Sequence, residues 1–501
     1  PALRWTAFHE RMAEAARSLG WNPFPGPAAI NTAEYGGRGG CGYHGYCNKG
    51  GCPLDAKNST HLTTIPKALA SGNLRVVTRA HVTTIQVDRE GRVTGVHYRV
   101  GTTEYFPPAR GVLLASYTYE NARLLLLSKS DAYPNGLSNN RGQVGRHYFS
   151  HHQGGAVSAL FPYDLKAWYG LPAQGVAVDE WADDNFDHTS HDFIGGGNLW
   201  AMSDRRPIGA ANMGTFGRAR AWGSDWKRFI RENADRSHGF YIQKTTLPYE
   251  DNYLDLDPRV TDALGFPVIR ITGEYKENER RVAAFVQDKA EEWYRAAGAT
   301  EVTRGGVGGA MGASTHAYGG TRMGDNPETN VVDRWGFSHE TPNLGVLGAS
   351  VMGTSGARNP TLTAQALAWR AAAHVAASSS SVAGSPRSSR PRSSWPRRCC
   401  SSCSRWWARW CSRARVGVHR SGTPRWCSSS PRCWRVICTH TSACGGSASA
   451  DRPCSTSWCW RSRWSRFRLR SPTGTRRSAV GSRAGFWASS PWPSARPSSC
   501  S

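Results

Sequence analysis

The first 378 residues of the chain are poor in cysteine and contain no long apolar segment. Cys41, Cys47 and Cys52 are the only cysteines before residue 379, and three clustered thiols do not describe a disulfide scaffold. No apolar run reaches the roughly 18 residues that a membrane-spanning helix needs. The opening residues, PALRW, include neither an initiator Met nor the apolar core of a signal peptide, so we interpret the chain as the interior of a longer gene product.

The segment from Ser379 to the C-terminus lacks lysine and has a single acidic residue, Asp451. Its 23 arginines account for about +22 of the net charge of +25, and it holds 11 of the 14 cysteines. Few aliphatic side chains remain to offset the conformational entropy of ordering, which predicts a disordered tail over residues 379–501. Arg, Ser, Pro, Trp and Cys without lysine are what GC-rich coding DNA gives in a wrong frame, and we interpret the tail as a frameshift product.

Residue periodicity before this tail predicts a mixed α/β chain. Phe8, Met12 and Leu19 fall at helical spacing, and Gly20 follows them as a C-cap. The remaining predicted elements are two strand-like runs within residues 74–100 that are separated by a turn at residues 89–91, a continuously apolar strand at 111–116, and helices at 120–128 and 275–297.

Residues 314–363 carry the most specific pattern. STHAYGGTRMG at 314–324 is followed by NVVD at 330–333, NLGVLGAS at 343–350 and NPTLT at 359–363. This ordered set resembles the C-terminal motif of the glucose–methanol–choline (GMC) oxidoreductases, and residues 74–128 and 143–152 resemble earlier parts of that family. The resemblance implies an α/β flavoprotein fold with an FAD-binding domain and a mixed-sheet substrate domain. Tyr117 and Gly348 are typical of the gluconate-dehydrogenase-like branch.

His316 and Asn359 are the predicted catalytic pair. Oxidising an alcohol with a flavin requires a base near neutral pKa for the hydroxyl proton and a polar group that holds the oxygen. A histidine, with a reference pKa of about 6.5, suits the first role. The resemblance implies that both side chains face one pocket over the flavin. The alternatives are a structural histidine, and an asparagine that caps a helix beginning at Pro360.

The resemblance also implies the residues that contact FAD. The small side chains of Gly348, Ala349 and Ser350 would let the backbone approach FAD. A helix that starts at Pro360 and Thr361 would point its free N–H groups at the flavin or its pyrophosphate. Val82 would lie against the adenine and Ala115 near it, although both also suit a core position. His147, His151 and His152 are further candidates for the site.

The Gly-rich segment 35–51 spaces its thiols as Cys41-x5-Cys47-x4-Cys52. Three thiolates suit a three-iron iron–sulfur cluster; zinc with His44 as fourth ligand, or free thiols, are the alternatives. The segment also contains Gly37-x-Gly39-x-x-Gly42, which we reject as a dinucleotide fingerprint because no strand leads into it and no helix follows it. The GxGxxG unit that opens a GMC enzyme would therefore precede Pro1.

These features predict five segments. Residues 1–59 form a helix and the cysteine loop, 60–149 and 311–378 belong to the FAD-binding domain, 150–310 form the substrate domain, and 379–501 form the tail. The predicted reaction is oxidation of a CH–OH group on a polyol, sugar or sugar acid, with an electron-acceptor subunit such as a cytochrome as the implied partner. A truncated, inactive remnant and a nucleic-acid-binding protein defined by its basic tail are the competing hypotheses.

Overall fold

The computed structural model describes residues 2–45, 47, 51–152, 155–167, 175–203, 209 and 214–381. All of the described residues belong to one compact unit. Of the predicted tail, only residues 379–381 are described, as the end of a helix. The remainder of that prediction lies outside the described residues.

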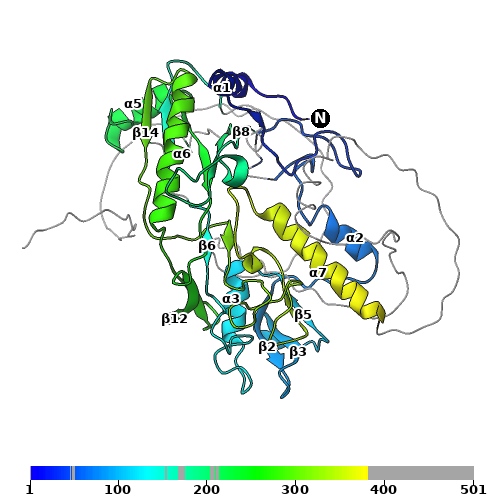
Figure 1. Cartoon of the computed structure of the whole chain (residues 1–501). Coiled ribbons are helices and arrows are strands. Elements are labelled where there is room, and N and C mark those ends of the chain that lie inside the picture. The colour runs from blue at the N-terminus through cyan, green and yellow to red at the C-terminus, as the bar shows by residue number, and fades with distance from the viewer. Residues whose placement is uncertain are drawn as a thin grey trace, which may run out of the picture. The chain divides into compact units, whose positions relative to one another are not determined.

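Helices and strands are mixed along this part of the chain (Figure 1). The helices are α1 (Ala7–Ser18), α2 (Thr64–Ala70), α3 (Thr118–Leu127), α5 (Gly223–Asn233), α6 (Glu277–Ala296) and α7 (Thr361–Ser381), with 3-10 turns η1 (Asp183–Asn185) and η2 (Ala349–Val351). The strands are β1 (Phe24–Pro25), β2 (Ala80–Val87), β3 (Val93–Val100), β4 (Thr103–Tyr105), β5 (Val112–Leu114), β6 (Phe149–Ser150), β7 (Val157–Leu160), β8 (Val176–Val178), β9 (Gly197–Ala201), β10 (Ser237–Gly239), β11 (Tyr241–Lys244), β12 (Tyr253–Thr261), β13 (Pro267–Thr272), β14 (Glu301–Arg304), β15 (Ala317–Tyr318) and β16 (Leu344–Val346).

One hydrophobic core surrounds α3 and two small sheets. The sheet β2–β3–β4 is antiparallel, whereas β5 and β16 pair in parallel. Val82, Leu114, Leu125 and Val346 are buried together in this core. Because the two strands of a parallel pair end at the same edge, the residues after Leu114 and Val346 leave the sheet side by side.

A second core lies between α1, α6 and two antiparallel sheets, ordered β1–β8–β9–β11 and β10–β7–β14. Figure 1 shows α1 beside α6. Trp293 of α6 is fully buried and donates its indole N–H to the Met12 carbonyl of α1 at 2.8 Å. The N-terminal helix is thus packed into the core that is formed mainly by residues 157–302.

Most of the predicted elements are present with shifted ends. The helix predicted over residues 5–19 is α1, and those predicted at 120–128 and 275–297 are α3 and α6. The first strand begins at Ala80, later than residue 74. The prediction that Asn359 caps a helix starting at Pro360 is wrong: α7 begins at Thr361, and the Pro360 carbonyl accepts the first helical bond from Ala364 N–H. No helix among the described residues is long and apolar enough to cross a membrane.

Candidate active site

A two-residue ladder sets His316 opposite His151. Strand β15 pairs antiparallel with β6, with Ala317 opposite Ser150 and Tyr318 opposite Phe149. The next pair outward in this register is His316 and His151, whose Nδ1 atoms lie 3.0 Å apart with the rings nearly perpendicular. Gly319 follows the ladder with φ +73°, and a Cβ there would overlap the His147 carbonyl oxygen. The glycine after the strand therefore permits the close approach of the two segments.

Asn359 reaches the opposite edge of the same histidine. Its Nδ2 lies 3.2 Å from Nε2 of His316, although the two residues are 43 positions apart. The preceding residues are fixed from the second core. Ala357 donates its N–H to Asp183 at 3.0 Å and accepts from Asn198, while Arg358 forms an ion pair with Asp179. The loop that carries Asn359 is thus held by polar contacts on the residue pair before it.

Two buried amides from the β9–β11 pair also border His316. Gln243 of β11 and Asn198 of β9 are directly paired across the sheet, and both are almost completely buried. The Nε2 atom of Gln243 lies 3.4 Å from Nδ1 of His316. Within the described part of the chain, Oε1 of Gln243 and Oδ1 of Asn198 have no hydrogen-bond partner. Buried amide oxygens without partners are costly, so they indicate a place where a polar ligand would be bound.

Burial keeps both histidines of the site neutral. Desolvation lowers the pKa of His316 below its usual value of 6.5. Desolvation, and next the proximity of His316, lower the pKa of His151 to about 4. A neutral imidazole can accept a proton, which is what a general base must do. His316 is half-buried and Asn359 is exposed, so the Nε2 edge of His316 is the one nearer to solvent.

Four of the predicted cofactor residues, Ala115, Gly348, Ala349 and Ser350, lie where β5 and β16 end. Asn121 of α3 ties the two strand ends together: its Oδ1 accepts from Ser116 N–H at 2.9 Å, and its Nδ2 donates to Ser350 Oγ at 2.9 Å. Ala115 and Gly348 directly follow the paired strands. Gly348 has φ +101°, and a Cβ built on it would meet no atom within 4 Å. There is open space beside the backbone at this position.

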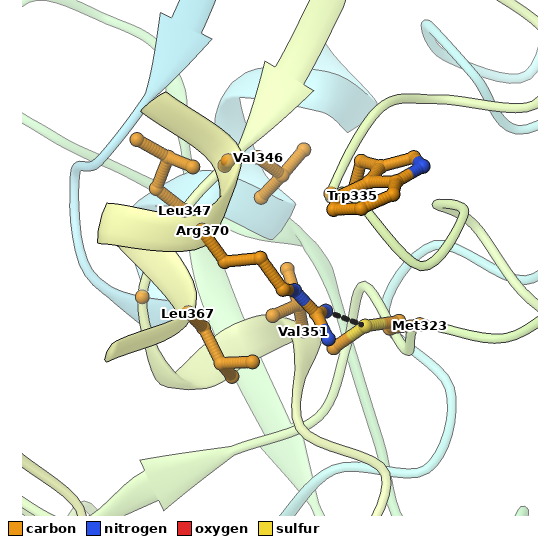
Figure 2. Close-up of a pocket in the computed structure, with 10 residues that line it drawn as sticks. Met323, Trp335, Val346, Leu347, Val351, Leu367 and Arg370 are labelled. Atoms are coloured by element: carbon orange, nitrogen blue, oxygen red, sulfur yellow. Dashed lines mark hydrogen bonds between the residues drawn. The ribbon is translucent and has the colours of Figure 1, made fainter. Parts of the chain in front are cut away.

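A pocket lies next to these strand ends, between β16 and α7 (Figure 2). Its lining includes Val346, Leu347, Gly348, Val351, Met323 and Trp335. The guanidinium of Arg370 extends from α7 to the Met323 sulfur, 3.0 Å away. Neither His316 nor Asn359 lines this pocket, so it is separate from the predicted catalytic pair.

The remaining candidate residues have other surroundings. Val82 is buried in the first core, Pro360 is buried, and Thr361 is exposed at the start of α7. Nδ1 of His147 lies 3.0 Å from the Pro248 carbonyl oxygen, within hydrogen-bond distance. His152 is buried with its ring against Tyr275. Of the three histidines at 147–152, the structure joins only His151 to His316.

The cysteine loop has no comparable organisation among the described residues. Cys41, Cys47 and Cys52 are free and partly buried, while residues 46 and 48–50 lie outside the description. Where the chain is described, no three His, Cys, Asp or Glu side chains are grouped to hold a metal. The Gly37–Gly42 segment is a turn with a bridge between Tyr35 and Arg38, and no described strand or helix adjoins it.

Comparison with known proteins gives one family. Models described as GMC oxidoreductase match residues 6–153 and residues 248–368. The flavoprotein of gluconate 2-dehydrogenase from Pantoea cypripedii is 30% identical over 394 residues, which are 74% of this chain and 63% of that protein. The 2-methyl-1,2-propanediol dehydrogenase of Mycolicibacterium austroafricanum is 31% identical over 382 residues, 75% of this chain and 67% of the relative. Paromamine 6'-oxidase from Streptomyces fradiae is 31% identical over 386 residues, 75% and 66% of the two chains. The chain therefore spans about two thirds of the length of these relatives.

Proposed function

Because the chain belongs to the GMC oxidoreductase family, we propose that it is the part of an FAD-dependent dehydrogenase that oxidises a CH–OH group. The observation that supports this most directly is the 3.2 Å contact between Asn359 and Nε2 of His316, in a motif whose spacing separates the two residues by 43 positions. A base and a hydrogen-bonding amide then meet at one point, as alcohol oxidation requires.

His316 takes the hydroxyl proton in this proposal. The O–H bond of the substrate breaks toward Nε2 of His316, and its electron pair forms the new C=O bond. FAD, when bound, accepts the hydride that leaves the carbon with two electrons. Asn359 holds the substrate oxygen beside Nε2, and the lowered pKa of His316 keeps the imidazole ready to accept the proton at neutral pH.

FAD fits the residues at the ends of β5 and β16. Cofactors of α/β proteins bind beyond the carboxyl ends of parallel strands, where Ala115 and the segment 348–350 lie. Gly348 offers backbone next to open space, and Asn121 fixes the two strand ends relative to each other. We assign the pyrophosphate side of FAD to Gly348, Ala349 and Ser350, with the N-terminus of α7 at Pro360 and Thr361 next to the flavin. Val82 keeps its proposed place near the adenine.

The substrate in this proposal is a polyol, sugar or sugar acid. Gln243 and Asn198 each provide a buried amide atom that has no partner in the described residues, and hydroxyl groups, which both donate and accept, would satisfy them. Three of the relatives are named for gluconate, 2-methyl-1,2-propanediol and fructose, and all three of these compounds bear hydroxyl groups.

An electron-acceptor subunit, such as a cytochrome, is the proposed partner, since one relative is named as the large subunit of fructose dehydrogenase. We derive no electron-transfer step through Cys41, Cys47 and Cys52, because the described residues form no ligand group there. An iron–sulfur cluster in that loop stays a prediction. Iron and acid-labile sulfide in anaerobically purified chain would support it, and zinc without sulfide would favour the His44 alternative.

The test is flavin binding followed by reduction. The full-length protein, including the GxGxxG unit predicted to precede Pro1, would be titrated with FAD by flavin fluorescence, then mixed anaerobically with gluconate, fructose and 2-methyl-1,2-propanediol while the visible flavin absorbance is recorded. Binding with bleaching by at least one hydroxyl compound is the expected result. FAD that binds but is never reduced, or is reduced equally by the His316→Ala variant, contradicts the proposal; failure to bind FAD favours the inactive-remnant hypothesis.

A further inference from the structure

We propose that His151 is a positioning residue that fixes the proton of His316 on Nδ1 and so leaves Nε2 as the atom that accepts the substrate proton. This inference rests on the proposed role of His316 as the base and deepens it. It follows from a chain of contacts that runs from the Gly356 carbonyl through His151 to His316.

The series of hydrogen bonds begins at the Gly356 carbonyl, which can only accept a hydrogen bond. The Gly356 carbonyl oxygen lies 2.9 Å from Nε2 of His151, so this nitrogen must carry a hydrogen and donate it. The Tyr318 hydroxyl, 2.8 Å from the same nitrogen, is compatible because its oxygen also accepts. Were Nε2 unprotonated, its lone pair would face the lone pairs of the carbonyl oxygen.

His151 has one ring hydrogen to give. It is 2% exposed, and desolvation lowers its pKa to about 4, so the ring is neutral at pH 7. With the hydrogen on Nε2, the Nδ1 atom of His151 has a lone pair and can only accept. Nδ1 of His316 lies 3.0 Å away and is therefore the donor. His316, also neutral, then has its single ring hydrogen on Nδ1 and a lone pair on Nε2.

The contacts of the two amide side chains with His316 are compatible with this proton position. Asn359 has its Nδ2 donor 3.2 Å from Nε2 of His316, which needs an acceptor at that nitrogen. The Gln243 contact also fits if the amide N and O of its side chain are interchanged, since these two atoms are nearly indistinguishable. Without the interchange, Nε2 of Gln243 faces Nδ1 of His316, which would set two donors against each other, and Oε1 is buried without a described partner. With the interchange, Oε1 accepts from the same Nδ1–H.

The strand ladder makes this arrangement specific. His151 and His316 extend the β6–β15 register by one pair, and Gly356 lies three residues before Asn359. One short segment therefore orients both edges of His316: Asn359 directly at Nε2, and Gly356 through His151 at Nδ1. The protonated edge is directed into the protein, and the accepting edge is directed toward the exposed side of the site.

Histidine nitrogen NMR of the full chain tests the proton position without any flavin. The long-range correlations of an isotope-labelled histidine distinguish Nδ1–H from Nε2–H, and His316→Ala identifies the signal. We expect His316 to be protonated on Nδ1 in the parent chain. His151→Phe removes the acceptor and should move at least part of the population to Nε2–H. His151→Gln should retain Nδ1–H, since its oxygen can accept from His316 while its NH₂ donates to Gly356.

His147→Phe is the matched control, because it removes a partly buried histidine from the same segment without a contact to His316. It should leave the His316 signal unchanged. Two results overturn the inference: His316 protonated on Nε2 in the parent chain, or a folded His151→Phe variant that keeps Nδ1–H. Should His151→Phe fail to fold, Nε2–H in the parent chain, or loss of Nδ1–H in His151→Gln, would still overturn the inference.

Flavin reduction supplies the functional readout. His151→Phe should lower the limiting rate by about tenfold or more with little change in KM, below the ~10⁴-fold that a wrong histidine tautomer costs a serine protease. His151→Gln should recover most of the rate. If no variant or parent reduces flavin while the tautomer behaves as expected, the proposed function fails and the positioning role of His151 stands.

Discussion

The His316 site and the Cys41–Cys52 loop both contain reactive side chains, but the polar contacts of those side chains differ between the two regions. Each ring nitrogen of His316 lies within 3.2 Å of a polar group from another segment. In the loop, the cysteine with the clearest contact is Cys41, whose sulfur accepts from Tyr43 N–H two residues away at 3.4 Å. The reactive nitrogens of the first site are held by tertiary contacts, whereas this sulfur contact in the loop is local.

The difference shows what prepares a side chain for chemistry. A general base contributes through a fixed geometry and a pKa shifted by burial, and both come from surrounding segments. A ligand loop can be ordered by its metal, because the binding free energy is partly folding free energy. The two regions should therefore respond differently to substitution, pH and thiol reagents.

The largest expected effect is that of His316→Ala on flavin reduction. Removing the base should lower the single-turnover rate by about 10²- to 10⁴-fold, while FAD binding survives because the imidazole is not assigned to the pyrophosphate. Stopped-flow absorbance with a polyol or sugar acid measures the rate. His97→Ala, which removes a histidine of β3 outside the site, should react like the parent. A parent-like rate in His316→Ala would make the histidine structural.

The pH dependence gives the next largest change. His316 must be neutral to accept a proton, and burial lowers its pKa below 6.5. The rate should therefore be constant above pH 6.5 and fall as the pH drops through the lowered pKa, by tenfold per unit once well below it. A profile of limiting flavin-reduction rates measures this. A rate profile with its midpoint above pH 6.5 would contradict a pKa lowered by burial. As a control, the residual rate of His316→Ala should not fall in this way at low pH.

Asn359→Ala should have a smaller effect. It removes one hydrogen bond to the oxygen and leaves the base in place, worth about 1–1.5 kcal/mol, or roughly a five- to tenfold loss of rate. The melting temperature should change little, because the Pro360 carbonyl and not the Asn359 side chain meets the first turn of α7. Stopped-flow kinetics and thermal melts would be run together. A loss as large as that of His316→Ala would mean that Asn359 does more than orient.

The smallest effect on the reaction is expected at the cysteine loop, where Cys47→Ser should leave flavin reduction within about twofold. Thiol alkylation distinguishes the cysteines instead. Burial, and next Cys41, raise the pKa of Cys47; at Cys52 burial also acts upward, but N–H groups of Lys57, Leu54 and Ala56 outweigh it and lower the pKa. Cys52 should therefore be alkylated first at neutral pH, since the thiolate reacts. Mass spectrometry follows the order, and faster labelling of Cys47 would contradict it.

Sequence patterns predicted the helices best where burial and spacing agree. In α1, Phe8, Met12 and Ala16 are buried on one face, so local periodicity carried the information. The start of α7 was misplaced because Asn before Pro suggests a cap, whereas in the structure the Asn359 side chain contacts His316. The side chain of Asn359 therefore makes a tertiary contact instead of the local cap that its residue type favours.

The sequence by itself determined the family and the α/β character and predicted that His316 and Asn359 form a pair, because these depend on residue types in a fixed order. The tertiary structure alone decided which of His147, His151 and His152 meets His316, and that Gln243 and Asn198 border the site. These contacts depend on strand register between segments 73 to 165 residues apart, as between Gln243 or His151 and His316. A shift of one residue would turn each side chain to the other face, and nothing in the local sequence of β6 or β11 fixes that register.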